Sequence, residues 1–342
     1  MRALLVHNPT AGTKGHDKDS IVDALKLADY EVVYVSTKAD DVKDALKKHY
    51  DLVVAAGGDG TVGYVFCHLA DRSTPIGVMP FGSANNVARS LGIAGTPAEL
   101  AEQWRIGYVQ QFHLMNVAED GGEKELLVEG FGVGLIPALI KRRAKDKKAD
   151  GAGDIRRGRR ALEKILQEIE LLDVEINIDG KSWKSDLISV DVLNIPFTGP
   201  ALPLAHAADP TDKLLDVVVL GSDQRKGFAE WVQSPQAAAP PVSARRGKTI
   251  HVRWRGADSR LDDELVRGKP EWREVKLTRD SVPLHIVRPA KHPAVKDQES
   301  AAGKILPLSA RATRRRGQTR TSDRTSELLC CARERCLSDP SR

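Results

Sequence analysis

The chain has 342 residues, of which 41% are hydrophobic and 29% are charged. This composition is typical of soluble globular proteins and excludes the fibrous and largely disordered classes. The length accommodates two domains of ordinary size. No apolar run reaches the roughly 18 residues of a membrane-spanning helix, and the amino-terminal apolar run is too short for a signal peptide. We therefore expect a cytoplasmic protein without an integral membrane anchor.

The net charge of +5 is unevenly distributed along the chain. Residues 141–160 contain ten Lys and Arg against three Asp, and residues 297–342 contain ten Lys and Arg against six acidic residues. Neither segment contains an aromatic residue that could stack on a base, so we expect no nucleic-acid partner. Segment 141–160 has two interpretations: a solvated charged face, or a patch attracted to an anionic membrane surface.

The first part of the chain alternates between short apolar runs and segments with helical periodicity. The pattern predicts strands over 3–7, 31–37, 51–56 and 75–79, and helices over 19–28, 40–49, 61–71 and 97–107. A turn over 80–89 opens a further helix. This alternation favours a parallel sheet that is covered by helices on both faces.

After about residue 110 the pattern changes to short strands separated by polar loops. The predicted strands are 112–118, 124–134, 173–180, 187–195, 214–220, 249–254 and 282–287. They indicate an antiparallel β-rich second domain, interrupted by a helical segment over roughly 134–171 and by a Pro- and Ala-rich loop over 234–248. From residue 291 onward the apolar periodicity ends, which predicts a disordered basic tail.

The stretch AAGGDGTVGY, residues 55–64, places three glycines and one Asp between a predicted strand and a predicted helix. Glycines allow the backbone to approach a phosphate closely, and free N–H groups at a helix start point at the anion. Asp59 would repel phosphate unless Mg²⁺ lies between them, as is common in phosphoryl-transfer sites. The alternative is a tight turn in which Asp59 only caps the helix.

Two further turns follow other strands of the predicted parallel sheet. NPTAGTKG covers residues 8–15 and PFGSANNVAR covers residues 80–89. Because the carboxyl ends of parallel strands meet at one edge, we expect all three turns there, with Gly12, Ser83 and Asn85 supplying donors to phosphates. The P-loop pattern and the GxGxxG fingerprint after the first strand are both absent from the sequence.

The set NPTAG, GGDGTV and MPFGSANNVARSLGI, in this order, resembles the diacylglycerol kinase catalytic-domain family, which includes soluble bacterial lipid kinases. The resemblance covers residues 1 to about 290, and its GGDGT element is shared with NAD kinases. It implies an α/β fold in which an NAD-kinase-like, Rossmann-type parallel-sheet domain is followed by an antiparallel β-sandwich domain. The implied nucleotide-binding domain is 1–112, completed near 280–290, the lipid-acceptor domain is 113–279, and the tail is 291–342.

The resemblance also implies a site for ATP and Mg²⁺ in the cleft between the domains. Asp59 would support magnesium and phosphate in catalysis, and Glu264, in LDDELV, would be the general base. Asp209, Asp212 and the carbonyl of Leu214 would bind a structural Mg²⁺. The implied nucleotide contacts are Asn8, Pro9, Thr10, Ala11, Gly12, Thr37, Gly57, Gly58, Asp59, Gly60, Thr61, Ser83 and Asn85.

Three residues depart from the family pattern: Asn86 stands where Asp is usual, and Asp263 and Lys213 stand where Gly is usual. The expected function is phosphorylation of a lipid hydroxyl, with diacylglycerol or a related lipid as acceptor. A kinase of a soluble acceptor such as NAD, and a regulator that has lost catalysis, remain alternatives. We expect peripheral contact with the inner membrane surface. The oligomeric state stays open, with a homodimer among the options. Residues 128–140 are interpreted either as one wall of an apolar acceptor cleft or as plain core.

Overall fold

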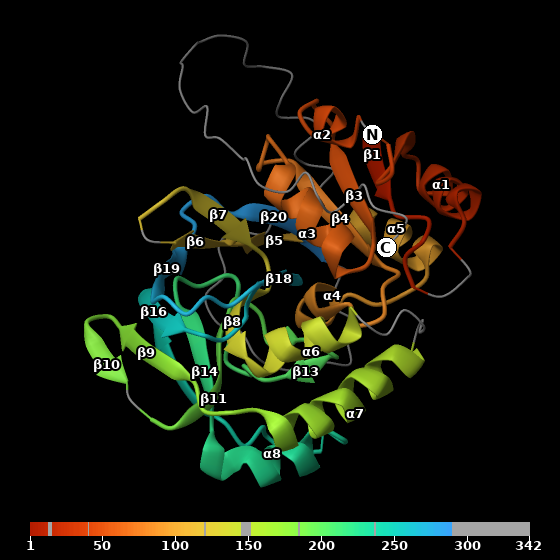
Figure 1. The fold of residues 1–342 in the computed structure, drawn as a ribbon. Coiled ribbons are helices and arrows are strands. Elements are labelled where there is room, and N and C mark those ends of the chain that lie inside the picture. The colour runs from red at the N-terminus through yellow and green to blue at the C-terminus, as the bar shows by residue number, and fades with distance from the viewer. Residues whose placement is uncertain are drawn as a thin grey trace.

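A computed structural model describes residues 1–12, 16–39, 41–119, 121–144, 152–183, 185–235 and 237–288. The chain forms an α/β part and a β-rich part, which lie side by side (Figure 1). The predicted disordered tail lies outside the described residues, as does the lysine-rich middle of the basic segment 141–160.

The α/β part is built on a six-stranded sheet with the order β2-β1-β3-β4-β20-β5. Its strands are β1 (Arg2–His7), β2 (Glu31–Ser36), β3 (Leu52–Gly57), β4 (Pro75–Pro80), β5 (Tyr108–Phe112) and β20 (Leu284–Arg288). The first four strands and β20 run parallel, and β5 is antiparallel to β20. Every residue of β3 is buried, as expected of a continuous apolar strand in a sheet covered on both faces.

Five helices follow the strands of this sheet: α1 (Lys18–Leu27), α2 (Val42–Ala45), α3 (Asp59–His68), α4 (Asn86–Ser90) and α5 (Pro97–Ile106). Helix α5 begins with a capping box in which Thr96 and Glu99 satisfy each other's backbone N–H groups. The predicted helix over 40–49 is wrong in its extent, because α2 has only four residues.

Strand β20 brings the end of the described chain back into the first sheet, between β4 and β5. The whole β-rich part is therefore inserted between two neighbouring strands of the α/β part. Arg72, in the loop before β4, donates to Val282 O at 2.7 Å and pairs with Asp280, which fixes the returning segment beside β4.

The β-rich part contains two six-stranded antiparallel sheets. The outer sheet consists of β10 (Lys181–Trp183), β9 (Asp173–Ile178), β16 (Thr249–Arg255), β19 (Arg273–Arg279), β6 (Met115–Glu119) and β7 (Lys124–Leu127). The inner sheet consists of β15 (Ser243–Gly247), β14 (Leu215–Gly221), β11 (Leu187–Leu193), β8 (Gly130–Gly134), β17 (Ser259–Leu261) and β18 (Glu264–Val266). One apolar cluster joins residues of both sheets, which makes this part a sandwich.

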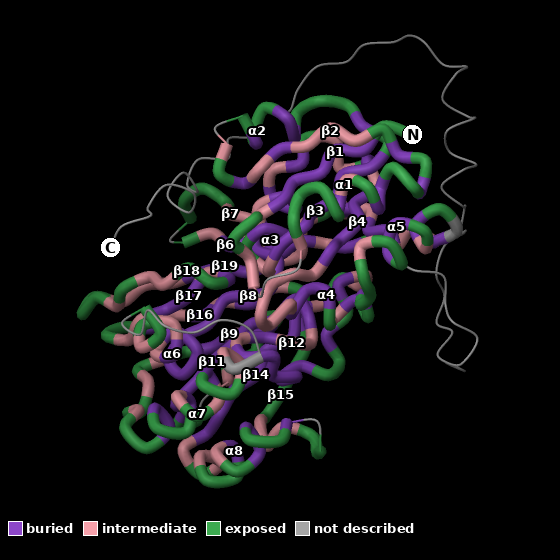
Figure 2. Tube along the Cα trace, turned by 90° about the vertical axis from the view of Figure 1, so that its right-hand side faces the viewer, coloured by how far each residue is buried: buried purple, intermediate pink, exposed green. Residues whose placement is uncertain are grey.

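A second apolar cluster covers the other face of the inner sheet. It is formed with helices α6 (Leu135–Arg143), α7 (Ala152–Glu168) and α8 (Arg225–Trp231), the last preceded by the 3₁₀ turn η1 (Ser222–Gln224). Strands β11 and β14 are consequently buried along their whole length (Figure 2). A short pair, β12 (Phe197–Thr198) and β13 (Leu202–Pro203), lies between this part and α4.

The structure has both predicted parts, and it corrects the sequence prediction in one loop. Residues 234–248 were expected to form a loop, but their last part forms β15, which pairs with β14. Its sequence, SARRG, has four exposed residues, as suits a sheet edge protected by charge.

Candidate active site

Three turns meet at the carboxyl edge of the first sheet. Gly12 has a φ of +59°, and a Cβ atom at this position would overlap the carbonyl oxygen of Phe81. A Cβ at Gly58 would lie 3.2 Å from the Cα of Gly82. The turns after β1, β3 and β4 therefore pack backbone against backbone, and the glycines permit this approach.

Two asparagines shape these turns with their own side chains. Asn8 Oδ1 accepts from the Thr10 N–H at 3.0 Å and from its hydroxyl at 2.9 Å. Asn85 adopts φ +50°, accepts from the Gly82 N–H at 2.8 Å and donates to the Gly82 carbonyl at 2.7 Å. Because the Asn85 amide is already used within its turn, a phosphate contact there would fall to backbone N–H groups.

The other predicted nucleotide residues lie along the same edge. Thr37 follows β2, is buried, and donates its N–H to His7 O at 2.9 Å. A Cβ added to Gly60 would meet nothing within 4 Å, so the start of α3 faces open space. The remaining members lie on the three converging turns: Pro9, Thr10 and Ala11 after β1, Gly57 to Thr61 around the start of α3, and Ser83 after β4.

Asp59 is the first residue of α3, and its carboxylate links two helix starts. Its Oδ1 accepts from the Val87 N–H at 3.0 Å, which ties α3 to the beginning of α4. Burial raises the pKa of Asp59 from 3.8 to about 6, and the nearby charge of Asp263 adds to this rise. The turns therefore hold a carboxylate whose ionisation depends on a charged residue of the β-rich part.

The hairpin of β17 and β18 supplies that opposite side. Asp262 has φ +50°, and its carboxylate accepts the N–H groups of Val128 at 3.0 Å, Glu129 at 2.8 Å and Gly130 at 3.0 Å. Arg260 donates to the Asp262 carbonyl at 2.9 Å. Asp262 thus anchors the beginning of β8, and its oxygens are used in this structural role.

Glu129 was not predicted as a site residue. It is 3% exposed, and Asn86 Nδ2 donates to its Oε2 at 3.2 Å. Burial raises the pKa of Glu129 well above its usual value, and the charges of Asp59, Asp263 and Asp262 raise it further. The signal in the sequence was a single acidic residue within an otherwise apolar, glycine-rich run, VEGFGVG.

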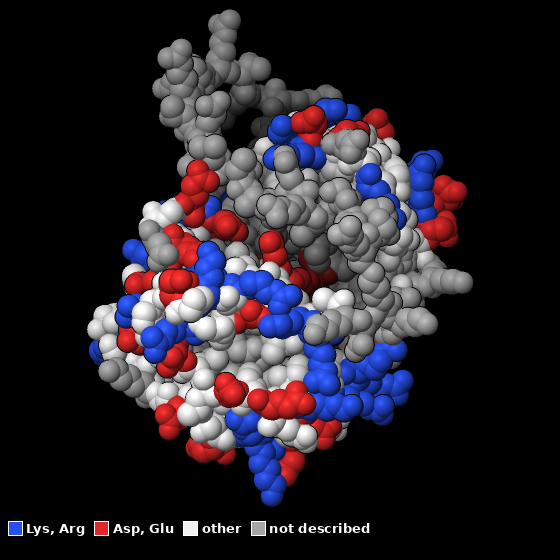
Figure 3. Space-filling model, in the orientation of Figure 1, with Lys and Arg blue, Asp and Glu red and all other residues white. Residues whose placement is uncertain are grey.

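The two acidic residues at the tip of this hairpin differ in their relation to the cleft. Both Asp263 and Glu264 are exposed, but Asp263 is the one whose charge raises the pKa values of Asp59 and Glu129. Figure 3 shows acidic side chains in a hollow between the two parts of the molecule, in the region of α4 and β18. The structure thus brings Asp59, Glu129 and Asp263 together from three separate segments.

The proposed structural metal loop is already engaged by arginines. Arg279 Nη2 donates to the carbonyls of Asp209 at 2.8 Å and Leu214 at 2.7 Å, and lies 3.7 Å from Asp212 Oδ1. Arg246 pairs with the same Asp212 at 2.5 Å. Guanidinium nitrogens therefore contact two of the three predicted ligand groups, the Asp212 carboxylate and the Leu214 carbonyl, and the loop does not fit a divalent cation. We derive no role for a metal there.

This arrangement predicts a loop whose stability is independent of metal. A chelator such as EDTA should leave the thermal unfolding midpoint unchanged, whereas Arg279→Met should destabilise the fold by about 3 kcal/mol because it leaves the carbonyls of Asp209 and Leu214 without their guanidinium donor. Burial lowers the pKa of Arg279 to about 10, so it stays charged at neutral pH. A fall in the midpoint of the unaltered protein with EDTA would contradict the assignment.

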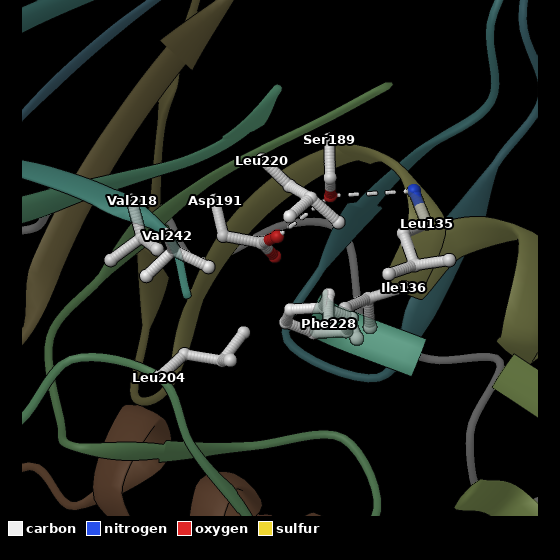
Figure 4. Close-up of a pocket in the computed structure, with 9 residues that line it drawn as sticks. All are labelled: Leu135, Ile136, Ser189, Asp191, Leu204, Val218, Leu220, Phe228 and Val242. Carbon is white, nitrogen blue, oxygen red and sulfur yellow. Dashed lines mark hydrogen bonds between the residues drawn. The ribbon is translucent and has the colours of Figure 1, made fainter. Parts of the chain in front are cut away.

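A small apolar pocket lies within the β-rich part, between the inner sheet and helices α6 and α8 (Figure 4). Its lining is Leu135, Ile136, Ser189, Asp191, Leu204, Val218, Leu220, Phe228 and Val242. Asp191 pairs with the buried Arg260 at 3.0 Å. The cavity volume of about 10 Å³ suits one water molecule and excludes an acyl chain. Leu135 and Ile136 therefore line a pocket between the inner sheet and the helices that cover it, rather than a cleft between the domains.

The fold and the site define a class: an α/β domain with three phosphate-type turns, facing acidic residues of an inserted β-sandwich. Residues 2–117 match the family model described as the diacylglycerol kinase catalytic domain. This segment is therefore similar to the catalytic domain of diacylglycerol kinases, and the resemblance inferred from the sequence is confirmed.

The similarity to known proteins extends beyond this segment. The chain is 28% identical to a diacylglycerol kinase from Bacillus subtilis over 68% of this chain and 77% of the relative. It is 25% identical to a diacylglycerol kinase from Mycobacterium tuberculosis over 72% and 79% of the two chains. A crystal structure of a diacylglycerol kinase from Bacillus anthracis shares the fold, with a TM-score of 0.61 at 19% identity, covering 86% of this chain and 98% of that one. These relatives support a kinase.

Proposed function

We propose that this protein is an ATP-dependent lipid kinase that transfers the γ-phosphate of ATP to a lipid hydroxyl, with diacylglycerol or a related lipid as acceptor. The observation that carries the proposal is the convergence of three glycine turns on Asp59, opposite acidic residues of the inserted sandwich. Such a site has a place for phosphates on one side and for a proton acceptor on the other.

The start of α3 would receive the phosphates. The N–H groups of Thr61 and Val62 bond to Gly58 O at 3.0 and 3.1 Å, which forms the first turn of the helix. The exposed Gly60 before them leaves room for an anion at the positive end of the helix dipole. Free backbone N–H groups at the start of a helix bind any nucleoside triphosphate. The preference for ATP therefore rests on the similarity to the kinase family.

Magnesium would accompany ATP, and Asp59 would hold it against the phosphates. Among the described residues, no three His, Cys, Asp or Glu side chains cluster closely enough to hold a metal unaided. This fits a cation that is carried by the nucleotide, because Mg²⁺ in such sites takes one or two carboxylates and obtains its other oxygens from phosphates and water. When bound, it neutralises the charge of the transferring phosphoryl group.

The hairpin of β17 and β18 would supply the base. As the lipid hydroxyl oxygen forms its bond to the γ-phosphorus, the bond from that phosphorus to the bridging oxygen of ADP breaks, and the hydroxyl proton passes to a carboxylate. Glu264 is exposed at the tip of this hairpin. We keep it as the proposed base, with Asp263 beside it acting on Asp59.

A basic surface would hold the enzyme at the membrane. Figure 3 shows Lys and Arg gathered over α7, where Arg156, Arg157 and Arg160 are exposed. Lys141, at the end of α6, is instead paired with Asp258 at 2.7 Å. None of the helices in the described segments is long and apolar enough to span a bilayer. Each exposed Arg near anionic headgroups would contribute about 1 kcal/mol to binding at the inner membrane surface.

The test is transfer of label from γ-labelled ATP, with Mg²⁺, to a panel of lipids in mixed micelles, beside NAD. We expect a labelled lipid, which would establish the activity and name the acceptor class. Label on NAD would overturn the lipid assignment in favour of a soluble-acceptor kinase. Binding of ATP without any transfer would overturn the catalytic assignment in favour of a regulator.

A further inference from the structure

The pair formed by Asn86 and Glu129, in the candidate site, includes two oxygen atoms without a hydrogen-bond partner. Asn86 donates both of its amide hydrogens, to Glu129 Oε2 at 3.2 Å and to Gly199 O at 3.1 Å. The remaining oxygens, Asn86 Oδ1 and Glu129 Oε1, are buried and have no partner. Both side chains are at least 97% buried, with exposures of 2% and 3%.

A buried oxygen without a donor is costly, and a buried carboxylate without a cation is more so. Arg260, whose charge favours ionised Glu129, is itself paired with Asp191 at 3.0 Å. The charges of Asp59 and Asp263 disfavour a further negative charge here. Both unpartnered atoms are oxygens, and oxygen is the ligand atom that a hard divalent cation prefers.

We infer that Glu129, oriented by Asn86, is a second carboxylate of this chain for the magnesium that accompanies the nucleotide, beside Asp59. The inference rests on the proposed function and deepens it. In this family an acidic residue is expected at position 86, where this chain has Asn. In this chain the acidic group of the pair is on the facing residue, Glu129, which Asn86 contacts.

The pairing of one carboxylate with one amide gives the experiment its design. Three variants are compared with the unaltered protein: Glu129→Gln, Asn86→Asp, and the double variant with both changes. The double variant keeps one carboxylate and one amide in the pair but reverses their positions. Glu274→Gln, on the outer sheet and paired with His251 at 2.9 Å, makes the same chemical change far from the cleft and is the matched control.

The primary readout is binding rather than turnover. The rise in unfolding temperature caused by a non-hydrolysable ATP analogue is measured as Mg²⁺ is titrated. We expect Glu129→Gln to raise the half-saturating Mg²⁺ concentration at least tenfold and to lower kcat at least tenfold, and the double variant to recover most of both losses. The unfolding temperature without ligand should stay the same or rise, because the change removes a buried ionisable group.

Two results would overturn the inference. One is an unchanged Mg²⁺ titration in Glu129→Gln, with or without a loss of unliganded stability, which would make Glu129 a structural residue only. The other is failure of the double variant to recover Mg²⁺ dependence although it folds. Failure of the proposed function looks different: the unaltered protein would transfer no phosphate to lipid, while its nucleotide binding would still require Mg²⁺ through Glu129.

Discussion

Asp59→Asn is expected to reduce phosphoryl transfer at least a hundredfold, the largest effect of any single change in this chain. The asparagine keeps an oxygen that can accept from the Val87 N–H, now made at 3.0 Å, so the junction of α3 and α4 should survive. What is lost is the negative charge that would hold magnesium against the phosphates. Steady-state kinetics with Mg²⁺-ATP and lipid micelles measure the loss.

The pH dependence of the same variant gives an independent check. The pKa of Asp59 is raised from 3.8 to about 6 in the folded state, so the folded state holds a proton that the unfolded state releases. The stability from this group is complete below about pH 4 and is lost as pH rises to about 6. Asp59→Asn should therefore be more stable than the unaltered protein at pH 7, and this difference should shrink towards pH 4.

Activity should follow the opposite course. If ionised Asp59 is required, kcat/KM for ATP rises as pH passes through about 6, with an apparent pKa that belongs jointly to Asp59 and Glu129. Near-normal activity of Asp59→Asn would disprove the model of the site. Flat activity between pH 5 and 8 would show that ionisation of this group is not required.

Glu264→Gln is expected to have the second largest effect, a fall in kcat of about a hundredfold or more with little change in ATP affinity. A base takes up its proton only in the transition state, so its removal affects turnover rather than nucleotide binding. The exposed position of Glu264 makes misfolding of the variant an unlikely source of the loss, and a thermal unfolding scan checks this.

Asp263→Asn is the matched comparison, one residue away on the same hairpin. Its charge raises the pKa values of Asp59 and Glu129. Its removal should therefore shift the acidic limb of the pH–activity profile to lower pH, while leaving kcat at pH 8 within a fewfold of normal. If Asp263→Asn lost the hundredfold in kcat and Glu264→Gln did not, the base would be Asp263. If Glu264→Gln mainly weakened ATP binding, the general-base role would be wrong.

The turns of the α/β part were predictable because each follows an apolar strand of a parallel sheet. Strands such as β3, LVVAAG, are continuous apolar runs, and parallel strands place their carboxyl ends at one edge. That geometry alone indicated that the segments around Gly12, Gly58 and Ser83 would be neighbours. The structure adds how close they are: Gly58 and Gly82 approach so closely that a single Cβ fills the space between them.

The acidic side of the site was less predictable because its neighbours are distant in sequence. Glu129 contacts Asn86, 43 residues earlier, and its backbone is held by Asp262, 133 residues later. Local pattern carries no information on such pairings. Strand β15 was missed for another reason: SARRG has no apolar alternation, since it is an edge strand with four exposed residues. The arginine contacts of the 209–214 loop likewise come from Arg279 and Arg246, on separate strands.

The late position of β20 matters for how this chain emerges from a ribosome. Strand β4 and strand β5 both pair with β20, so the first sheet stays open at its centre until Arg288 has been synthesised. At translation rates of about 5–20 residues per second, the delay between β5 and β20 is roughly 10–30 s. During that interval the nascent chain carries an unpaired strand edge, which is a template for aggregation. A messenger broken before the codon for Leu284 would make this exposure permanent. Correct folding of the α/β part therefore depends on complete synthesis of the β-rich part.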